Sequence, residues 1–388
     1  MAEYGGTVVI GAGLAGLRTV EELRAHGYAG RIALIGAEQR PPYDRPPLSK
    51  KILTAPDAPD PSLRADFDAL GVDFQPGRVI SALDEVRDLG QVVIATGADP
   101  VRLPGLGAQR VLRSYDDALA LRALLRPGLR MAIVGAGWIG AELATAAAGA
   151  GCKVTVVEAG PAPMAAALPG SIGAIAASWY GPAGVELRLR TAVSSVEDGG
   201  LALADGSWLA ADCVVTAVGV RPSVSWLAGS GVVLENGVAV DAGLRSSVPG
   251  VYAVGDCAAF WSGRFGRRLR FEHWDVALHA PSVVAANLLG GDEAYDPVPY
   301  FWSEQFGRMV QYAGYHADAT ALLWRGDPTG GGAAKWAACW LSGDRLVAIL
   351  AVDRPRDLVQ ARRLIADGVP LDASRLTDPA VSLKDSAG

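Results

Sequence analysis

The sequence predicts an α/β protein in which one strand–turn–helix–strand unit occurs twice and a smaller α+β region follows. The first copy runs from the apolar residues 7–10 through the glycine-rich turn 11–16 into a helical pattern. The second runs from residues 131–134 through the turn 135–140 into an alanine-rich helix. Alternating strands and helices of this kind predict parallel sheets covered by helices.

Both turns follow the pattern Gly-x-Gly-x-x-Gly. The first glycine makes the tight turn, the second lets the backbone approach a pyrophosphate, and the third lets helix and strand pack closely. The pyrophosphate then meets the free N–H groups and the positive end of the helix. Two Rossmann-like dinucleotide sites are therefore predicted. They comprise Gly11, Gly13, Leu14, Ala15 and Gly16 in the first copy and Gly135, Gly137, Trp138, Ile139 and Gly140 in the second.

Each copy ends in an acidic residue. Glu38 lies 22 residues after Gly16, and Glu158 lies 18 residues after Gly140, close to the ~20 residues expected for a carboxylate that binds ribose hydroxyls. Two complete copies favour two bound nucleotides over two chance glycine-rich helix starts. Because no Lys or Arg occurs at 159–187, the second site is predicted to prefer NADH to NADPH. The alternative is a cation from a distant loop, such as Arg188 or Arg221.

A third apolar strand, residues 251–254, ends in Gly255 and Asp256. Such an aspartate is well placed to accept hydrogen bonds from the ribityl chain of FAD, whereas the alternative is that it caps the following helix. Together with the N-terminal turn, it predicts FAD in the first copy. Two more apolar strands, within residues 92–97 and 214–219, end in Thr-Gly and Val-Gly at the exits of the two nucleotide units. They add Ala95, Thr96, Gly97 and Gly219 to the predicted site residues.

Composition narrows the classes of function. The chain has 388 residues, is half hydrophobic and carries a formal net charge of -6, so we expect a soluble globular protein that does not bind nucleic acid. No apolar run approaches ~20 residues and the N-terminus lacks a basic region, so we expect no membrane span, no secretion signal and a cytoplasmic location. The four cysteines and four histidines lack CxxC or metal-ligand spacing, so we expect neither a redox disulfide nor a metal site.

Several segments together resemble the ferredoxin reductase family of bacterial oxygenase systems, the group of putidaredoxin reductase and the aromatic-ring dioxygenase reductases. The most specific is Pro42-Tyr43-Asp44-Arg45-Pro46-Pro47-Leu48-Ser49-Lys50, which unrelated Rossmann proteins do not carry. The resemblance also rests on residues 95–98, the second glycine turn with Glu142, 251–256, 272–274, 300–305 and 354–357.

The resemblance implies a FAD domain of residues 1–106 and 222–298, split by an NADH domain of residues 107–221. From about Pro299, strands at 334–341 and 346–352 and a helix at 357–366 predict a C-terminal α+β interface domain of residues 299–388. The implied reaction is hydride transfer from NADH to FAD and single-electron transfer to an acidic two-iron ferredoxin that supplies an oxygenase. The link Ile80–Gln91 is shorter than the β excursion of relatives, which leaves local partner contacts in question.

By resemblance, Lys50 and Glu142 meet beside the flavin N5 as an ion pair and are the predicted catalytic residues, because a cation there stabilises charge on the reduced flavin. The alternative is two solvated surface charges. Trp302 is expected against the isoalloxazine or in a domain interface. Trp138 either covers the ring or packs at its helix start. The predicted cofactor-binding residues also include Arg45, His273 and Trp274.

Four arginines form a basic run that either steers an acidic ferredoxin or lies on a solvated hairpin. They are Arg264, Arg267, Arg268 and Arg270. Two other functions fit the motifs: an NADH:flavin oxidoreductase that reduces oxygen, a quinone or a pathway intermediate, and an NADH-sensing flavoprotein resembling apoptosis-inducing factor. Fast reduction of a ferredoxin would indicate the ferredoxin reductase, and fast turnover on oxygen alone would indicate the NADH:flavin oxidoreductase. A long-lived charge-transfer complex between NAD and flavin, with slow turnover, would indicate the sensing flavoprotein.

Overall fold

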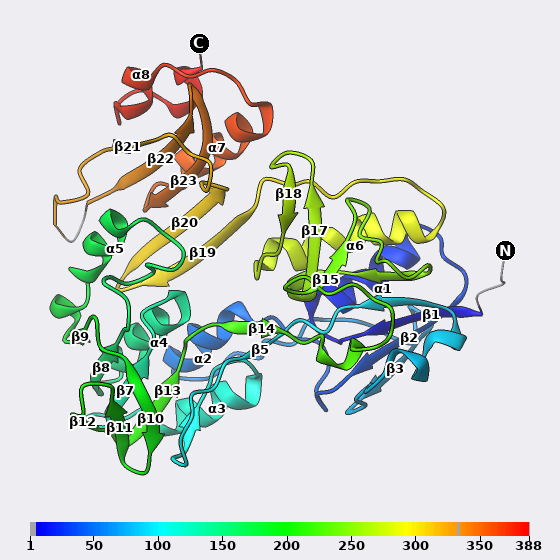
Figure 1. Ribbon diagram of the computed structural model, residues 1–388, viewed down its shortest axis with the longest axis horizontal. Coiled ribbons are helices and arrows are strands. Elements are labelled where there is room, and N and C mark those ends of the chain that lie inside the picture. The colour runs from blue at the N-terminus through cyan, green and yellow to red at the C-terminus, as the bar shows by residue number, and fades with distance from the viewer. Residues whose placement is uncertain (1–4, 332–333, 388) are drawn as a thin grey trace. The chain divides into compact units, whose positions relative to one another are not determined.

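A computed structural model describes residues 5–331 and 334–387 of the chain (Figure 1). The chain folds into two units. One comprises the residues up to Asp44, Pro61–Asp99 and Arg221–Pro299, and the other comprises Arg45–Asp60, Pro100–Val220 and the residues from Tyr300 on. Residues 1 and 388, the outer bounds of the predicted domains, lie outside the described residues. The inner domain boundaries stay predictions; packing groups residues 45–60 with the second unit.

The first unit is built on a parallel sheet in the order β16-β4-β1-β2-β3. Its strands are β1 (Gly6–Ile10), β2 (Arg31–Gly36), β3 (Val72–Pro76), β4 (Gln91–Ile94) and β16 (Val251–Ala253). Helices α1 (Leu14–Ala25) and α6 (Trp274–Leu288) pack on each other. A smaller sheet contains β15 (Val238–Val240), β17 (Ala258–Ser262) and β18 (Arg267–Leu269). Every residue of β1 is buried, as expected for a central parallel strand.

The short link before β4 folds through contacts of its own. It forms two 3-10 turns, η2 (Leu83–Glu85) and η3 (Arg87–Leu89). The Glu85 carboxylate accepts hydrogen bonds from the backbone N–H groups of Ser81 and Ala82 at 2.8 and 3.0 Å, and Leu83 is buried. This short segment is therefore held by its own hydrogen bonds and by the burial of Leu83.

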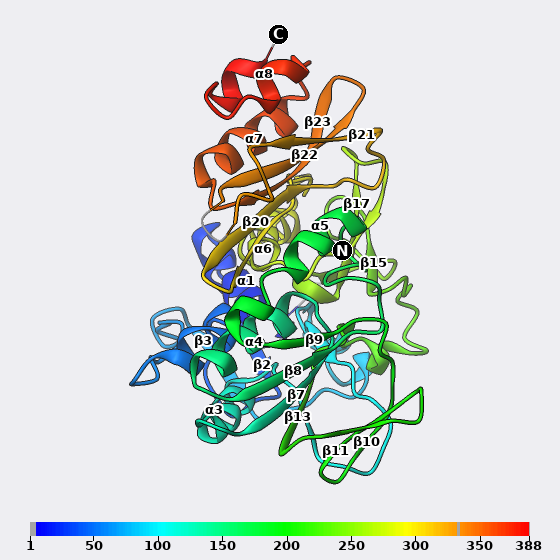
Figure 2. The same ribbon diagram turned by 90° about the vertical axis from the view of Figure 1, so that its left-hand side faces the viewer.

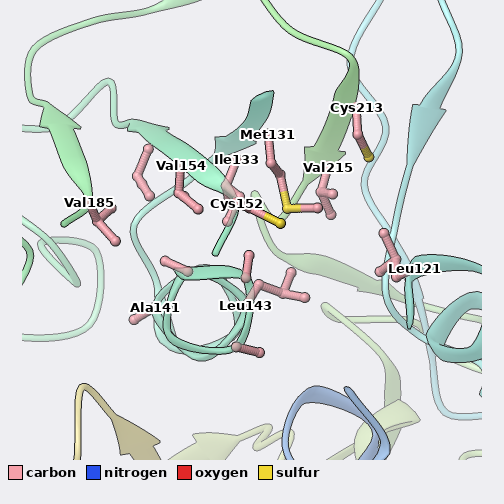
Figure 3. Packing of buried hydrophobic residues seen from close by; sticks show 14 of the residues in the cluster. Leu121, Met131, Ile133, Ala141, Leu143, Cys152, Val154, Val185, Cys213 and Val215 are labelled. Atoms are coloured by element: carbon pink, nitrogen blue, oxygen red, sulfur yellow. The ribbon is translucent and has the colours of Figure 1, made fainter. Parts of the chain in front are cut away.

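The second unit contains a parallel sheet in the order β6-β13-β7-β8-β9. The strands are β6 (Gln109–Arg110), β7 (Arg130–Val134), β8 (Lys153–Val157), β9 (Glu186–Arg188) and β13 (Cys213–Thr216). The accompanying elements are η1 (Pro46–Ser49), α2 (Lys51–Thr54), α3 (Tyr115–Leu124), α4 (Trp138–Gly149), α5 (Gly170–Ala177) and the meander β10 (Val193–Glu197), β11 (Gly200–Leu203) and β12 (Trp208–Ala210). Figure 3 shows Ala141 and Leu143 of α4 beside the sheet residues Ile133 and Val154, in one buried cluster. The alanine-rich sequence of α4 thus lets the helix lie close to the strands.

The same unit contains the C-terminal region, an antiparallel sheet in the order β19-β20-β23-β22-β21. Its strands are β19 (Tyr300–Gln305), β20 (Arg308–Gly314), β21 (Ala321–Arg325), β22 (Trp336–Ser342) and β23 (Arg345–Val352). Helices α7 (Pro355–Asp367) and α8 (Ala373–Thr377) lie against it, red in Figure 2. The predicted strands and helix are confirmed, with α7 starting earlier because proline is favoured in a first helical turn.

A buried arginine ties the last residues to this sheet. Arg325 is 1% exposed; its Nε donates to Asp357 Oδ2 at 2.9 Å, and its other nitrogens donate to the carbonyls of Leu376 and Val381. Together with a bond to the carbonyl of Asp378, these partners satisfy a charge that would otherwise be costly to bury. Within the described ranges, no helix is long and apolar enough to cross a membrane.

Candidate functional site

The first glycine turn joins β1 to α1 and has the geometry of a pyrophosphate cradle. Gly11 has φ +112°, and a Cβ there would lie 2.2 Å from the carbonyl oxygen of Ala95. A Cβ on Gly16 would lie 1.8 Å from the carbonyl oxygen of Gly11. At Gly13, by contrast, a Cβ would meet nothing within 4 Å. The turn is closed at its first and third glycines and open at the second, where a diphosphate must approach.

The second turn, between β7 and α4, repeats this geometry. Cβ atoms on Gly135 and Gly140 would lie 2.4 and 2.0 Å from backbone oxygens, whereas Gly137 faces open space. Gly13 and Gly137 are the N-caps of α1 and α4, and neither helix start receives a side-chain capping bond. Both turns therefore fit the phosphates of a dinucleotide, which would accept hydrogen bonds from these helix starts.

The two acids at the strand ends differ in their contacts. Glu38 accepts a hydrogen bond from the Tyr43 hydroxyl at 2.7 Å, a contact with the PYDRPPLSK segment that sequence reasoning missed. The Glu158 carboxylate accepts from the backbone N–H of Ala136 at 2.8 Å and of Gly160 at 2.7 Å. Glu158 is thereby fixed at the edge of the second glycine turn, where a ribose would lie beside the pyrophosphate.

Other predicted residues of the first unit gather around its turn. Thr96 donates to the carbonyl of Ser223 at 2.7 Å, and Gly97 has φ +71°. A Cβ on Gly255 would lie 3.0 Å from the Cβ of Ala15 in α1. Asp256 lies in the 3-10 turn η6 (Gly255–Cys257), which runs into β17. Because a strand follows Asp256, the alternative in which this aspartate caps a following α-helix is not observed.

The segment before α6 places two further predicted residues in the same unit. The Trp274 indole donates to Asp44 Oδ1 at 2.6 Å, which links the Glu-His-Trp segment to the PYDRPPLSK segment. Burial raises the pKa of Asp44, and this hydrogen bond partly opposes the rise. His273 stacks on Phe271 with ring centroids 4.9 Å apart. Burial lowers the pKa of His273 to about 4, although the nearby charge of Asp256 acts in the opposite direction.

The His273 shift predicts how stability depends on pH. Its folded-state pKa of about 4 lies below the ordinary histidine value of about 6.5, so the unfolded chain binds a proton first as the pH falls. The contribution of neutral His273 is fully present above about pH 6.5 and is lost as the pH falls toward 4. We expect the melting temperature to fall through this window, and to fall less in His273→Gln. If the melting temperature of His273→Gln falls with pH as steeply as those of the native protein and of the exposed control His26→Gln, the assignment is contradicted.

A buried carboxylate cluster forms around Glu142 in the second unit. Glu142, on α4, is 3% exposed. Its Oε2 accepts from Lys50 Nζ at 2.9 Å and from the Ser49 hydroxyl. Its Oε1 accepts from the Ser303 hydroxyl at 2.6 Å and from the backbone N–H of Glu304 at 3.2 Å. The predicted Lys50–Glu142 pair is present, and the alternative of two solvated charges does not apply.

The cluster joins three parts of the chain through one carboxylate. Lys50 follows η1, Glu142 lies in the first turns of α4, and Ser303 lies on β19. The Lys50 side chain keeps 14% of its surface exposed, whereas that of Glu142 keeps 3%. The carboxylate is therefore a fixed interior anchor, and the ammonium is held against it by a side chain that is largely buried. Ser49 and Ser303 escaped sequence reasoning because an isolated serine in a motif carries no signal of its own.

The remaining predicted residues of this unit have simpler surroundings. Trp138 packs edge-on against Phe301 of β19, with ring centroids 4.7 Å apart, which favours the packing alternative. Trp302 stacks on Tyr300 at 6.0 Å, and an Arg45 guanidinium nitrogen donates to the carbonyl of Arg113 at 2.7 Å. Ile139 is exposed beside the second glycine turn, and Gly219 has φ +101°.

The basic run lies on a hairpin formed by β17 and β18. Arg268 donates to Glu235 at 3.0 Å and to the carbonyl of Ala259 at 2.9 Å. Arg270 donates to the carbonyl of Asp256 at 3.1 Å and pairs with Glu272. The guanidinium groups of these two arginines therefore support the hairpin itself.

A fold with two dinucleotide turns, one of them beside an ion pair held in the interior, defines an oxidoreductase that uses two nucleotide cofactors. The chain belongs to the pyridine nucleotide-disulphide oxidoreductase family, whose pattern matches residues 6–280. A reductase C-terminal domain matches residues 300–387. Proteins of this family use FAD and NAD(H), so the predictions of fold, enzyme class and cofactors are confirmed. All four cysteines are buried and free.

Three relatives cover nearly the whole chain. The ferredoxin--NAD(+) reductase component of the anthranilate 1,2-dioxygenase system of Burkholderia cepacia is 37% identical over 97% of this chain and 98% of its own. The crystal structure of Fdr9 is 46% identical, with a TM-score of 0.91 over 97% of this chain and 99% of its own. A chain of the putidaredoxin reductase–putidaredoxin complex is 28% identical, with a TM-score of 0.90, and the match covers 98% of this chain and 97% of that chain. The resemblance to oxygenase-system reductases is confirmed.

Proposed function

We propose that this protein transfers electrons from NADH through FAD to a two-iron ferredoxin that supplies an oxygenase. The observation that carries the proposal is the Lys50 ammonium, held by a buried Glu142 in a chain with two dinucleotide turns and no cysteine pair. In the proposed reaction, electrons leave the reduced flavin for an external acceptor. The relative from Burkholderia cepacia and the complex with putidaredoxin support a ferredoxin as that acceptor.

Each part of the chain has a defined task in this proposal. Bound FAD converts a two-electron donor into a source of single electrons. The first glycine turn and Glu38 hold the FAD nucleotide, and the second turn and Glu158 hold that of NADH. Lys50 supplies a fixed cation that stabilises negative charge on the reduced flavin, because Glu142 prevents it from turning away. Ser49 and Ser303 keep the Glu142 carboxylate oriented.

A cytoplasmic location is part of the proposal. Free, buried cysteines are typical of proteins in a reducing compartment, and all four cysteines here are of this kind. NADH is also a coenzyme of the cytoplasm. Fractionation of the native host should place the protein with soluble cytoplasmic enzymes, and recovery in the periplasm would contradict this part.

Steady-state kinetics test the proposed function. NADH oxidation is measured with a panel of two-iron ferredoxins from oxygenase systems and cytochrome c as final acceptor, and again with oxygen alone. We expect at least one ferredoxin to raise turnover about a hundredfold or more above the rate with oxygen, given typical turnover numbers of about 1–1000 per second for physiological reactions. Turnover with oxygen or a quinone that no ferredoxin exceeds would contradict the proposal.

The hairpin arginines provide a separate prediction about the partner. Arg264 is exposed and Arg267 is half-buried, and reversal of their charge should slow encounter with an acidic ferredoxin. We expect Arg264→Glu with Arg267→Glu to raise the KM for ferredoxin about three- to tenfold at low salt, with ferricyanide reduction unchanged. Arg87→Glu, at an exposed arginine of the same unit, is the matched control. An equal change in the control would reject a local docking role.

A further inference from the structure

The backbone around Glu158 is hydrogen-bonded to residues 188–191 of the same unit. The Glu158 N–H donates to the carbonyl of Arg188 at 2.8 Å, and the Thr191 N–H donates to the carbonyl of Glu158 at 2.9 Å. Between them, the Arg190 N–H donates to the carbonyl of Gly160 at 2.9 Å. The backbone of Arg190 is therefore fixed beside the acid, although the two residues are far apart in sequence.

The two arginines of this segment differ in their partners. Arg188 Nε lies 2.8 Å from Glu186 Oε1, so its charge is already compensated. Arg190 is exposed, and among residues 5–331 and 334–387 no carboxylate oxygen lies within 4.0 Å of its guanidinium. A full positive charge thus lies on the segment that borders the ribose-recognition acid.

The backbone of Arg190 is strained. Its φ of 52° falls in the left-handed region, which residues other than glycine seldom adopt unless the surrounding structure holds them there. Here the restraint comes from its bond to Gly160 and from the neighbouring bond between Thr191 and Glu158. These hydrogen bonds therefore keep Arg190 next to the Glu158 loop, where the chain turns away from the direction of β9.

We propose that Arg190 is a second determinant of coenzyme choice: a cation beside the ribose site that binds a 2′-phosphate once the charge of Glu158 is removed. The proposal rests on the proposed function only in taking the second glycine turn as the nicotinamide dinucleotide site. A guanidinium matches the geometry of a phosphate, whereas a carboxylate repels it. Glu158 then favours NADH, whereas Arg190 favours NADPH, and the effect of Glu158 is the larger one. Removal of the Glu158 charge would therefore let the site accept NADPH without a new cation.

The test is calorimetric binding to the FAD-loaded protein, with ADP-ribose and 2′-phospho-ADP-ribose as probes that carry no nicotinamide. We expect the native protein to favour ADP-ribose about a hundredfold. Glu158→Gln should bring the two affinities to within about tenfold. Adding Arg190→Ala to Glu158→Gln should weaken binding of the phosphorylated probe about tenfold or more and leave ADP-ribose unchanged.

Two further variants make the result specific. Arg190→Lys in the Glu158→Gln background should retain part of the affinity for the 2′-phosphate, and Arg188→Ala should leave it unchanged. Equal binding of the phosphorylated probe by Glu158→Gln with and without Arg190→Ala would overturn the proposal alone. Failure of both probes to bind any variant would overturn it together with the assignment of the second turn in the proposed function.

Discussion

Gly13→Asp is expected to give a folded but colourless protein, whereas Gly137→Asp should stay yellow and lose reduction by NADH. Both glycines face open space, so a side chain meets nothing within 4 Å. Their backbone angles, φ -86° and -77° with ψ -167°, are open to any residue. Aspartate is also a favoured N-cap, worth about 1 kcal/mol relative to alanine. The variants should therefore fold normally while a carboxylate occupies the place of a diphosphate.

The expected effect is large because the new carboxylate would occupy the place where the diphosphate must bind, and the two anions repel each other. We expect Gly13→Asp to lose FAD affinity by at least about a thousandfold, as for a repulsive element of several kcal/mol. Gly137→Asp should release FAD, not FMN, on denaturation. It should be reduced by dithionite at the normal rate and by NADH at less than about one-hundredth of it. Melting temperatures at or above that of the apoprotein show that folding is intact. Loss of FAD from Gly137→Asp with retention in Gly13→Asp would reverse the two assignments.

The second large effect is expected at the buried carboxylate cluster. Glu142→Gln removes the charge that compensates Lys50, so it should lower the free energy of unfolding by about 3–5 kcal/mol, as for breaking a buried ion pair. Flavin reduction by NADH should also slow about a hundredfold, because the ammonium is no longer held in place. Stopped-flow absorbance and thermal unfolding of the same preparation measure the two effects.

Lys50→Met separates catalysis from stability. It removes the cation but leaves Glu142 its hydrogen bonds from Ser49, Ser303 and the Glu304 backbone, so the loss of stability should be smaller than in Glu142→Gln. The rate of flavin reduction should fall as far as in Glu142→Gln. Lys51→Met, at the adjacent exposed lysine, is the matched control. If Lys50→Met reduces at the normal rate, the pair is purely structural.

The sequence predicted the parts of this protein whose physics is local. A glycine turn, the strand before it and the helix after it are specified within a few consecutive residues, and the two turns have the predicted geometry at Gly11–Gly16 and Gly135–Gly140. Apolar periodicity likewise placed β22, β23 and α7 close to their observed bounds. In each case the residues that decide the structure are neighbours in the chain.

Contacts between segments that are far apart in the chain could not be predicted from the sequence. Ser303 donates a hydrogen bond to Glu142, 161 positions away, and Trp274 donates one to Asp44, 230 positions away. Neither segment has a sequence pattern that predicts its partner. The sequence pointed to Arg188 or Arg221 as a possible distant cation and not to Arg190, because only the folded chain brings the Arg190 backbone beside Gly160. Arg268 and Arg270 read as surface charge, yet their guanidinium groups bind backbone carbonyls.

The central claim is that two electrons from NADH leave the flavin one at a time for a ferredoxin. The most direct measurement is an anaerobic titration, in which one equivalent of NADH is added to catalytic amounts of the protein with excess oxidised two-iron ferredoxin. The account predicts about two ferredoxins reduced per NADH, since the flavin splits the pair, and a rate that Gly137→Asp abolishes. Stoichiometric reduction of the flavin by NADH with no transfer to any two-iron ferredoxin would contradict the claim.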